Sequence, residues 1–209
     1  MTKLLILGAT GGTGRHVLAQ ALDKGYDVTV LTRHPDSLPI GIVGARVLTG
    51  DVLDDVALAG AIRGQDVVVS TLGVGKSLKP GGLIAASAPA IVRTMEQAGV
   101  KRLIFTSGYG VGDTYQDVPL VPRIMIAVLL RNIYADKKAG EDVIRASPLD
   151  WTLVYPSTLA DKPKTGKYRV GEHLELSGLP TIAREDVADF LVSQVEDRTY
   201  VRRGVLIST

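Results

Sequence analysis

A glycine-rich turn near the start of the chain constrains the fold more than any other feature of the sequence. The apolar run at residues 3–7 leads directly into this turn, and its glycines recur at every third position, at Gly8, Gly11 and Gly14. The residues that follow place one apolar helical face at Val17, Leu18, Ala21 and Leu22. A buried strand, a glycine-rich turn and a helix in this order are typical of the first unit of a dinucleotide-binding domain.

Each glycine has a separate role in such a turn. Gly8 allows the bend, Gly11 lets the backbone approach a pyrophosphate, and Gly14 permits close packing of the helix on the strand. The helix N-terminus offers unpaired N–H groups and a partial positive charge to phosphates. The spacing differs from the standard G-x-G-x-x-G, so a tight turn that binds nothing is the alternative. We expect diphosphate contacts from Gly8, Thr10, Gly11, Gly12, Thr13 and Gly14.

Strand-like and helix-like segments alternate through the rest of the chain. Further strands are predicted at 27–32, 45–49, 66–71, 101–106, 151–155 and 204–208, the last as an edge strand. Helices are predicted at 54–62, 83–98 and 184–195, with a further long helix ending near 146. This alternation predicts an α/β protein with one doubly wound parallel sheet, Rossmann-like, and helices on both faces. We expect a single domain over residues 1–209, with substrate-side elements at about 156–180.

The composition excludes several classes of function. Lys and Arg total 24 against 22 Asp and Glu, so no basic field points to nucleic acid. The chain has no cysteine, and its three histidines, His16, His34 and His173, are far apart, so we expect no metal site. The apolar run at 124–130 is too short to span a bilayer. We expect a cytoplasmic protein with a small-molecule substrate and no membrane partner, and nothing indicates an oligomer, although one is possible.

Small and polar residues follow three of the central predicted strands. Parallel strands bring their carboxyl ends to one edge of the sheet, where ligands bind in folds of this type. Ser, Gly and Pro also punctuate ordinary turns, and that is the alternative explanation. These residues should lie at the same edge of the sheet as the glycine turn. We therefore expect coenzyme contacts from Thr71, Leu72, Gly73, Ser107, Pro156 and Ser157.

The end of the second predicted strand distinguishes NAD from NADP. An NAD site places a carboxylate there for the ribose 2′-hydroxyl, whereas Arg33 stands at this point in the chain. A guanidinium can bind a 2′-phosphate with a forked pair of charged hydrogen bonds, so we expect NADP(H). Asp51, with Val52 beside it, is placed to meet the adenine edge, although Asp51 could equally cap the next helix.

These residues carry a family likeness. The glycine turn, Arg33, the segment 50–52, Ser107 and the segment 150–156 resemble the atypical short-chain dehydrogenase/reductase group. Within that group the chain is most similar to small NAD(P)H-binding proteins of the biliverdin IXβ/flavin reductase kind and to NmrA-like proteins. The resemblance implies that residues 8–15 and Arg33 bind NADPH. It also implies a nicotinamide near residues 71–73, Ser107 and residues 156–158.

A second motif concerns catalysis. Tyr134 and Lys138 have the Tyr-x-x-x-Lys spacing of the larger superfamily and share one helical face. An adjacent ammonium would lower the pKa of a tyrosine, and Ser107 could hydrogen-bond a substrate carbonyl. Such pairs also meet by chance, and the Lys- and Glu-bearing stretch 137–141 resembles the matching helix of members without a working Tyr/Lys pair. The candidate catalytic residues are therefore Ser107, Tyr134 and Lys138.

Three functions follow from these features. The first is an NADPH-dependent oxidoreductase that transfers a hydride to a flat conjugated acceptor, flavin-like or tetrapyrrole-like, and needs little acid–base help. The second is a carbonyl reductase or dehydrogenase that uses Ser107, Tyr134 and Lys138. The third is a non-catalytic regulator that senses NADP(H). The polar segment 161–178 either contacts an anionic substrate or is a solvated loop. For the apolar segment 119–130 there are three alternatives: it covers the pocket, contacts another subunit or packs in the core.

Overall fold

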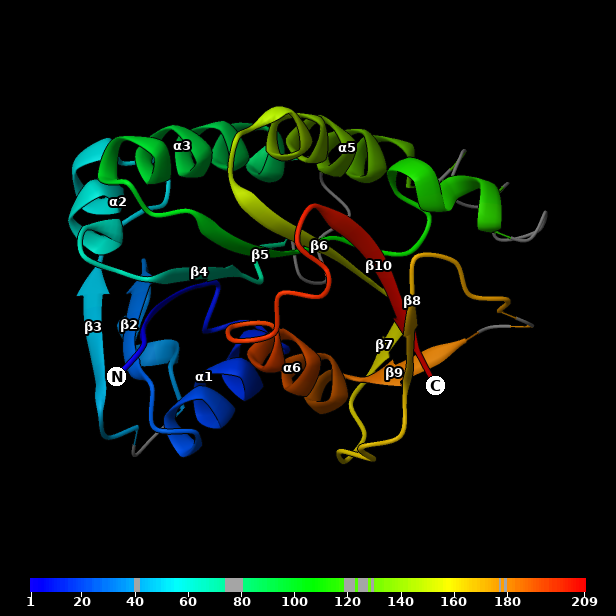
Figure 1. Cartoon of the computed structure of the whole chain (residues 1–209), viewed down its shortest axis with the longest axis horizontal. Coiled ribbons are helices and arrows are strands. Elements are labelled where there is room, and N and C mark those ends of the chain that lie inside the picture. Colours follow the sequence, from blue (N-terminus) through cyan, green and yellow to red (C-terminus); the bar gives the residue numbers. More distant parts are fainter. Residues whose placement is uncertain are drawn as a thin grey trace.

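One mixed sheet runs through the centre of the molecule, with strand order β3-β2-β1-β4-β5-β6-β10-β8 (Figure 1). The computed structural model describes residues 1–39, 42–73, 81–118, 123, 128, 130–176, 178 and 180–209. Neighbouring strands are parallel as far as β10, and β8 is antiparallel to β10. The strands are β1 (Lys3–Leu7), β2 (Asp27–Thr32), β3 (Ala45–Thr49), β4 (Val67–Ser70), β5 (Arg102–Thr106), β6 (Asp150–Pro156), β8 (Arg169–Gly171) and β10 (Arg203–Ser208).

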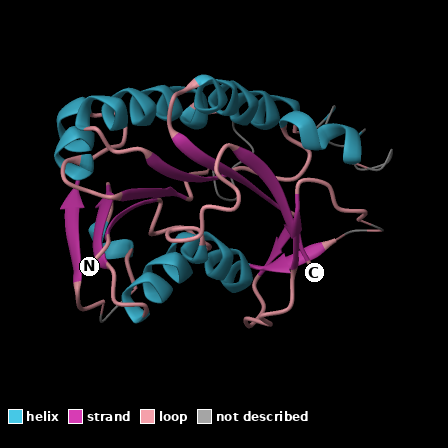
Figure 2. Ribbon diagram, in the orientation of Figure 1, coloured by secondary structure: helices cyan, strands magenta, loops and turns pink. Residues whose placement is uncertain are grey.

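Helices cover both faces of this sheet, as Figure 2 shows. One face carries α2 (Asp55–Ile62), α3 (Leu83–Ala98) and α5 (Arg131–Ala146), and the other carries α1 (Gly14–Asp23) and α6 (Arg184–Ser193). The alternation of side chains along a strand explains the two apolar cores. In β1, Leu5 and Leu7 pack in the core under α2, α3 and α5, while Leu4 and Ile6 pack under α1 and α6. The predicted doubly wound α/β architecture is confirmed.

The carboxyl-terminal third departs from the predicted elements in two respects. The prediction that residues 204–208 form an edge strand is wrong, because β8 pairs outside β10, with Leu206 opposite Gly171. A separate two-stranded sheet of β7 (Thr158–Ala160) and β9 (Thr181–Ala183) was not predicted either. These strands have only three residues each, too few to show an alternating pattern.

The order of the strands places a switch point beside the glycine turn. The chain passes from β1 to β2 and β3 on one side, and then crosses to β4 on the other side of β1. Ligands of doubly wound sheets bind in the crevice at such a switch point, outside the carboxyl ends of the strands. Gly8 follows β1 and Thr71 follows β4, so the turn and the start of the next loop meet there.

No helix in the described part of the chain combines the length and the apolar character that crossing a bilayer requires. The apolar run at 124–130, and with it the segment 119–130, lies outside the described residues apart from positions 123, 128 and 130. The structure therefore does not decide among the three roles expected for that segment.

Candidate functional site

The glycine turn is too tight for side chains at two of its positions. Gly8 has a φ of +87°, and a Cβ there would lie 2.9 Å from the carbonyl of Thr71. A Cβ on Gly14 would lie 2.0 Å from the carbonyl oxygen of Gly8. The Gly11 N–H donates to that same oxygen at 3.0 Å, and this bond closes the turn. The bend at Gly8 and the close packing at Gly14 expected from the sequence are both present.

The N-terminus of α1 is left open by this turn. Thr13 is the N-cap residue, and its side chain makes no capping hydrogen bond. The first turn of the helix carries no acidic residue. No acidic residue of the first turn therefore offsets the positive end of the helix dipole, which favours an anion at this point. A dinucleotide diphosphate fits these residues.

A cleft extends from the glycine turn across the carboxyl ends of β1 to β4. Its lining includes most of the predicted coenzyme contacts: Gly8, Thr10, Gly11, Arg33, Asp51, Val52, Thr71, Leu72 and Gly73. Thr71 Oγ1 donates to the carbonyls of Leu7 and Gly8, at 3.2 Å each, and ties the loop after β4 to the turn. Residues from four separate segments of the sequence thus converge on one cleft.

Arg33 and Asp51 face each other at the far end of this cleft. Their Nη1 and Oδ2 atoms lie 3.6 Å apart, and both side chains are partly exposed. The helix α2 is capped by Asp54, which accepts hydrogen bonds from the amides of Val56 and Ala57. Asp51 is thus not the helix cap, and its other oxygen accepts from the amide of Leu53 at 2.9 Å.

Two further predicted coenzyme contacts, Pro156 and Ser157, lie at the end of β6. Ser157 is buried, and its hydroxyl donates to the hydroxyl of Ser208 at 3.0 Å. The carbonyl of Pro156 accepts from the amide of Tyr109 at 3.1 Å. The Ser157 side chain therefore links β6 to β10, and a contact between this residue and a coenzyme stays a prediction.

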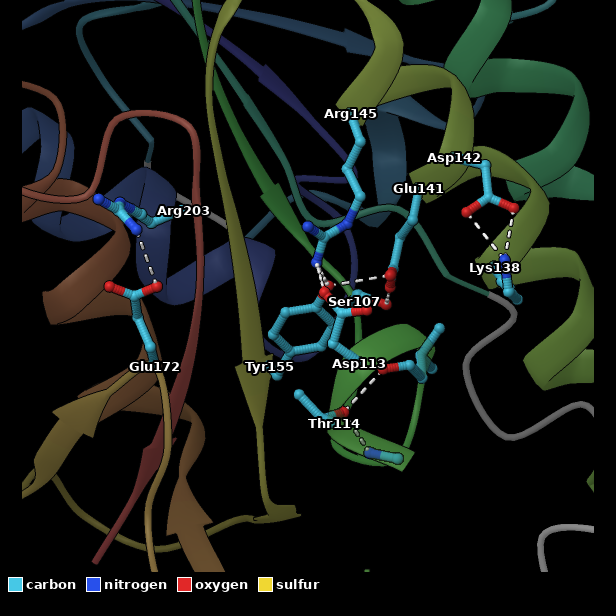
Figure 3. A network of polar contacts seen from close by, with 12 residues as sticks. Ser107, Asp113, Thr114, Lys138, Glu141, Asp142, Arg145, Tyr155, Glu172 and Arg203 are labelled. Carbon is cyan, nitrogen blue, oxygen red and sulfur yellow. Dashed lines mark hydrogen bonds and ion pairs between the residues drawn. The ribbon is translucent and has the colours of Figure 1, made fainter. Parts of the chain in front are cut away.

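A closed polar network lies behind the end of β5 (Figure 3). Glu141 of α5 accepts hydrogen bonds from the hydroxyl of Ser107 and, at 2.9 Å, from the hydroxyl of Tyr155. Arg145 donates to Tyr155 at 3.0 Å and pairs with Asp113 at 3.1 Å. The network joins α5 to the ends of β5 and β6, so it fixes where those strands present the loops of the site.

Burial shifts the pKa values of two ionisable side chains near Ser107. Burial raises the pKa of Glu141 above its ordinary value, and the hydrogen bonds from Ser107 and Tyr155 and the charges of Arg145 and Lys137 oppose that shift. Burial also lowers the pKa of Lys137, whose ammonium donates to the carbonyl of Ser107 at 3.1 Å. The Lys137 ammonium also lies 3.0 Å from where a Cβ on Gly108 would stand. A half-buried lysine therefore supports the loop after β5.

The three predicted catalytic side chains each have a different partner. The hydroxyl of Tyr134 donates to the carbonyl of Tyr109 at 3.1 Å, and burial raises the pKa of Tyr134. The ammonium of Lys138 pairs with Asp142 at 2.6 Å on the exposed side of α5. Because Ser107 donates to Glu141, the structure does not join Ser107, Tyr134 and Lys138 in one hydrogen-bonded group. Their catalytic role stays a prediction.

Lys137 and Glu141 were not predicted as site residues, although α5 carries a signal for them. The buried residues of α5 are Gly140, Glu141 and Ile144, and Lys137 precedes these at helical spacings of three, four and seven. Lys138 and Asp142 are each one position further on and face solvent. The face of the helix, rather than the Tyr-x-x-x-Lys spacing, identifies the inward-facing lysine.

A second cavity of about 490 Å³ opens beside the loop after β5. Its lining is mostly apolar and includes Gly110, Val111, Gly112, Tyr115, Arg131, Tyr134, Ala135 and Lys138. Strands β4 and β5 are parallel neighbours, with Ser70 opposite Phe105, so they end side by side. Residues 71–73, after β4, line the nucleotide cleft, and residues 110–112, after β5, line the second cavity.

The polar segment after β7 is anchored rather than free. The amides of Thr165 and Gly166 and the hydroxyl of Thr165 all donate to the buried carboxylate of Asp186, at 2.7 to 2.9 Å. Lys164 pairs with Asp189 at 2.6 Å. Both carboxylates belong to α6, so this part of the segment packs along that helix and Lys164 has an acidic partner within the protein.

Comparison with known proteins agrees with this geometry. A family described as NAD(P)H-binding matches residues 8–198. The chain belongs to this family. The resemblance to NAD(P)H-binding proteins expected from the sequence is thereby confirmed.

Individual relatives in this family have diverse names. Phenylcoumaran benzylic ether reductase PT1 of Pinus taeda is 28% identical over 169 residues, which are 76% of this chain and 50% of that protein. Photosystem II assembly factor Ycf39 of Guillardia theta is 31% identical over 216 positions, covering 97% of this chain and 63% of that protein. The chain therefore spans only part of the length of these two proteins. The structure of an anaerobillin reductase from Escherichia coli O157:H7 has a TM-score of 0.82 at 25% identity, covering 99% of this chain and 96% of that one.

Proposed function

We propose that this protein is an NADPH-dependent oxidoreductase that passes a hydride to a flat conjugated acceptor, flavin-like or tetrapyrrole-like. The observation that carries the proposal is the presence of two cavities, one lined in part by the glycine turn and the other in part by Tyr115 and Tyr134. Membership of the NAD(P)H-binding family and similarity to reductases support it. In this proposal residues 1–209 act as one nucleotide-binding unit, with substrate-side elements at about 156–180.

The coenzyme in this proposal is bound by the cleft at the switch point. The glycine turn and the N-terminus of α1 receive the diphosphate, and Arg33 receives the 2′-phosphate that distinguishes NADP from NAD. Arg33 supports this because no carboxylate stands at its position at the end of β2, where an NAD site places one. When bound, the coenzyme supplies the hydride.

The acceptor in this proposal occupies the second cavity. Tyr115 and Tyr134 offer aromatic surface to a flat molecule there, and Arg131 lies at the same cavity and suits an acceptor with acidic groups. Lys137 holds the loop after β5 through its hydrogen bond to the Ser107 carbonyl. These residues would keep the acceptor fixed against the end of the nucleotide cleft, which is the main requirement for hydride transfer to a conjugated system.

A second function has support of a different kind. A relative that covers 97% of this chain is named an assembly factor rather than a reductase. A regulator that binds NADP(H) without oxidising it would use the same cleft. The carbonyl reductase alternative needs Ser107, Tyr134 and Lys138 to act together, and their present partners give it less support.

One assay separates these functions. NADPH absorbance is followed with FMN, with a quinone and with a panel of carbonyl compounds, beside a binding titration of the same preparation. Oxidation with FMN or the quinone supports the proposed function. Oxidation with carbonyl compounds alone that is lost in Tyr134→Phe would support the carbonyl reductase instead. Tight binding with no oxidation by any acceptor would contradict the enzyme and support the regulator.

A further inference from the structure

Gly12 is a glycine that the three-glycine pattern does not explain. It stands beside Gly11 in the turn, and it is not among the described glycines with a positive φ. A Cβ at Gly12 would lie 3.1 Å from Cδ and Nε of Arg184 and 3.3 Å from its Cζ. The space beside Gly12 is therefore occupied by the side chain of Arg184, a residue far away in the sequence.

Arg184 is the first residue of α6, the helix that packs beside α1. Its Nε donates to Asp161 at 2.8 Å, and within the described ranges no acceptor pairs with its two terminal nitrogens. The Arg184 side chain is 24% exposed and that of Asp161 is 82% exposed. An ion pair this open to water is weak, so it positions the guanidinium without holding it against a stronger anionic ligand.

The backbone around Asp161 is in turn held on α6. Thr165 and Gly166 donate to the buried carboxylate of Asp186, and Lys164 donates its backbone N–H to Glu185 at 3.0 Å. Asp161 therefore faces Arg184 from a segment fixed to the same helix as Arg184 itself. Glu185, the next residue of α6, lies 3.7 Å from His16 of α1.

We propose that Arg184 is a diphosphate-binding residue of the coenzyme site, supplied by the distal half of the chain and aimed by Asp161. The glycine turn offers N–H groups and a helix dipole but no side-chain cation of its own at Gly12. A guanidinium above that turn adds the full charge and forked donors that suit a phosphate. In this proposal, position 12 is a glycine because a larger side chain would crowd Arg184. At Gly8 and Gly14 a side chain would instead crowd backbone atoms.

This inference rests on the proposed NADPH binding and is tested by calorimetric titration with two fragments. The first, 2′-phospho-ADP-ribose, has the diphosphate and the 2′-phosphate, whereas the second, 2′-AMP, has only the 2′-phosphate. In Arg184→Met, affinity for the first fragment is expected to fall about tenfold or more, the scale of one charged hydrogen-bonding group, with affinity for 2′-AMP unchanged. Arg33→Met should weaken both fragments, and Lys162→Met, which removes an exposed cation beside Asp161, should weaken neither.

Gly12→Ala gives a second approach that keeps the arginine. Its methyl group would stand 3.1 Å from Cδ and Nε of Arg184, so the arginine side chain must shift and the same selective loss is expected in weaker form. The double variant Gly12→Ala/Arg184→Met should be no weaker than Arg184→Met alone. Thermal unfolding of each variant, including the milder change Arg184→Lys, checks that the fold is intact. Unchanged affinity for 2′-phospho-ADP-ribose in a folded Arg184→Met would overturn this inference alone, as would an equal loss for 2′-AMP. Absence of binding by the wild-type protein would overturn the proposed function as well.

Discussion

The carboxylate of Glu141 accepts the hydroxyl hydrogen of Ser107 in a site closed to solvent, where Glu141 is 1% and Ser107 is 6% exposed. This contact joins the inner face of α5 to the loop after β5. The same loop supplies Gly110, Val111 and Gly112 to the lining of the second cavity. The protonation of one buried acid therefore bears on the geometry of that cavity.

The pH dependence of stability should report this buried acid. Because burial raises the pKa of Glu141 above 4.5, the folded state binds its proton more tightly than the unfolded state does. The contribution of Glu141 to stability is therefore largest at low pH and falls as pH rises through its folded pKa. Denaturant unfolding should show the stability gap between wild type and Glu141→Gln narrowing from pH 5 to pH 7. Asp142→Asn, one position away on the exposed face, is the control, and a gap that widens with pH would contradict the prediction.

Coenzyme preference should depend on Arg33. Arg33→Ala should weaken NADPH binding about tenfold, the scale of one charged hydrogen-bonded pair, and leave NADH binding unchanged. Asp51→Asn should strengthen NADPH binding, because it removes the carboxylate 3.6 Å from that guanidinium. Fluorescence titration of both coenzymes measures these effects. Equal loss of NADPH and NADH affinity in Arg33→Ala would show that Arg33 does not read the 2′-phosphate.

Adjacent lysines on α5 should behave differently. Lys137→Met removes the ammonium that supports the Ser107 carbonyl, so turnover should fall about tenfold or more, as expected when a group that fixes a reacting geometry is lost. Lys138→Met removes an exposed pair with Asp142 and should leave turnover within about twofold, because such pairs contribute little. Steady-state kinetics with FMN and NADPH compare the two variants. A larger loss in Lys138→Met would favour the Tyr-x-x-x-Lys pair instead.

Tyr134→Phe should retain turnover of a conjugated acceptor. The Tyr134 hydroxyl donates to the carbonyl of Tyr109, and burial raises its pKa, so this hydroxyl is held away from proton transfer. The phenylalanine variant keeps the ring at the second cavity and loses one hydrogen bond, which destabilises the fold by about 1 kcal/mol. Turnover and thermal stability are measured together, and a loss of turnover without a loss of stability would return Tyr134 to the mechanism.

Two Gly→Ala changes should have opposite effects on stability. Gly14→Ala places a Cβ 2.0 Å from the carbonyl oxygen of Gly8, so it should prevent the native turn and lower stability by several kcal/mol. Gly60→Ala lies in α2, where a Cβ meets nothing within 4 Å, and it should raise stability by about 0.5–1 kcal/mol through helix propensity. Thermal unfolding of both variants checks the pair. Similar behaviour of the two would show that crowding at the turn is not the cause.

The sequence predicted those parts of the structure that local patterns encode. The strand–turn–helix at residues 3–23 and the continuous apolar strands gave the order of elements and one edge where their loops meet. The inward placement of Glu141 and Lys137 depended on how α5 packs, and the motif spacing from Tyr134 selected Lys138, which pairs with Asp142 on the exposed side of that helix. The contact of Arg184 with Gly12 joins residues far apart in the sequence, and a single sequence carries no local pattern for such a contact.

The central claim is that the cleft at the switch point binds NADPH. Calorimetric titration of the purified wild-type protein with NADPH and, separately, with NADH tests it most directly. The account predicts saturable binding of NADPH at one site per chain, with weaker binding of NADH. No measurable binding of either coenzyme would contradict it.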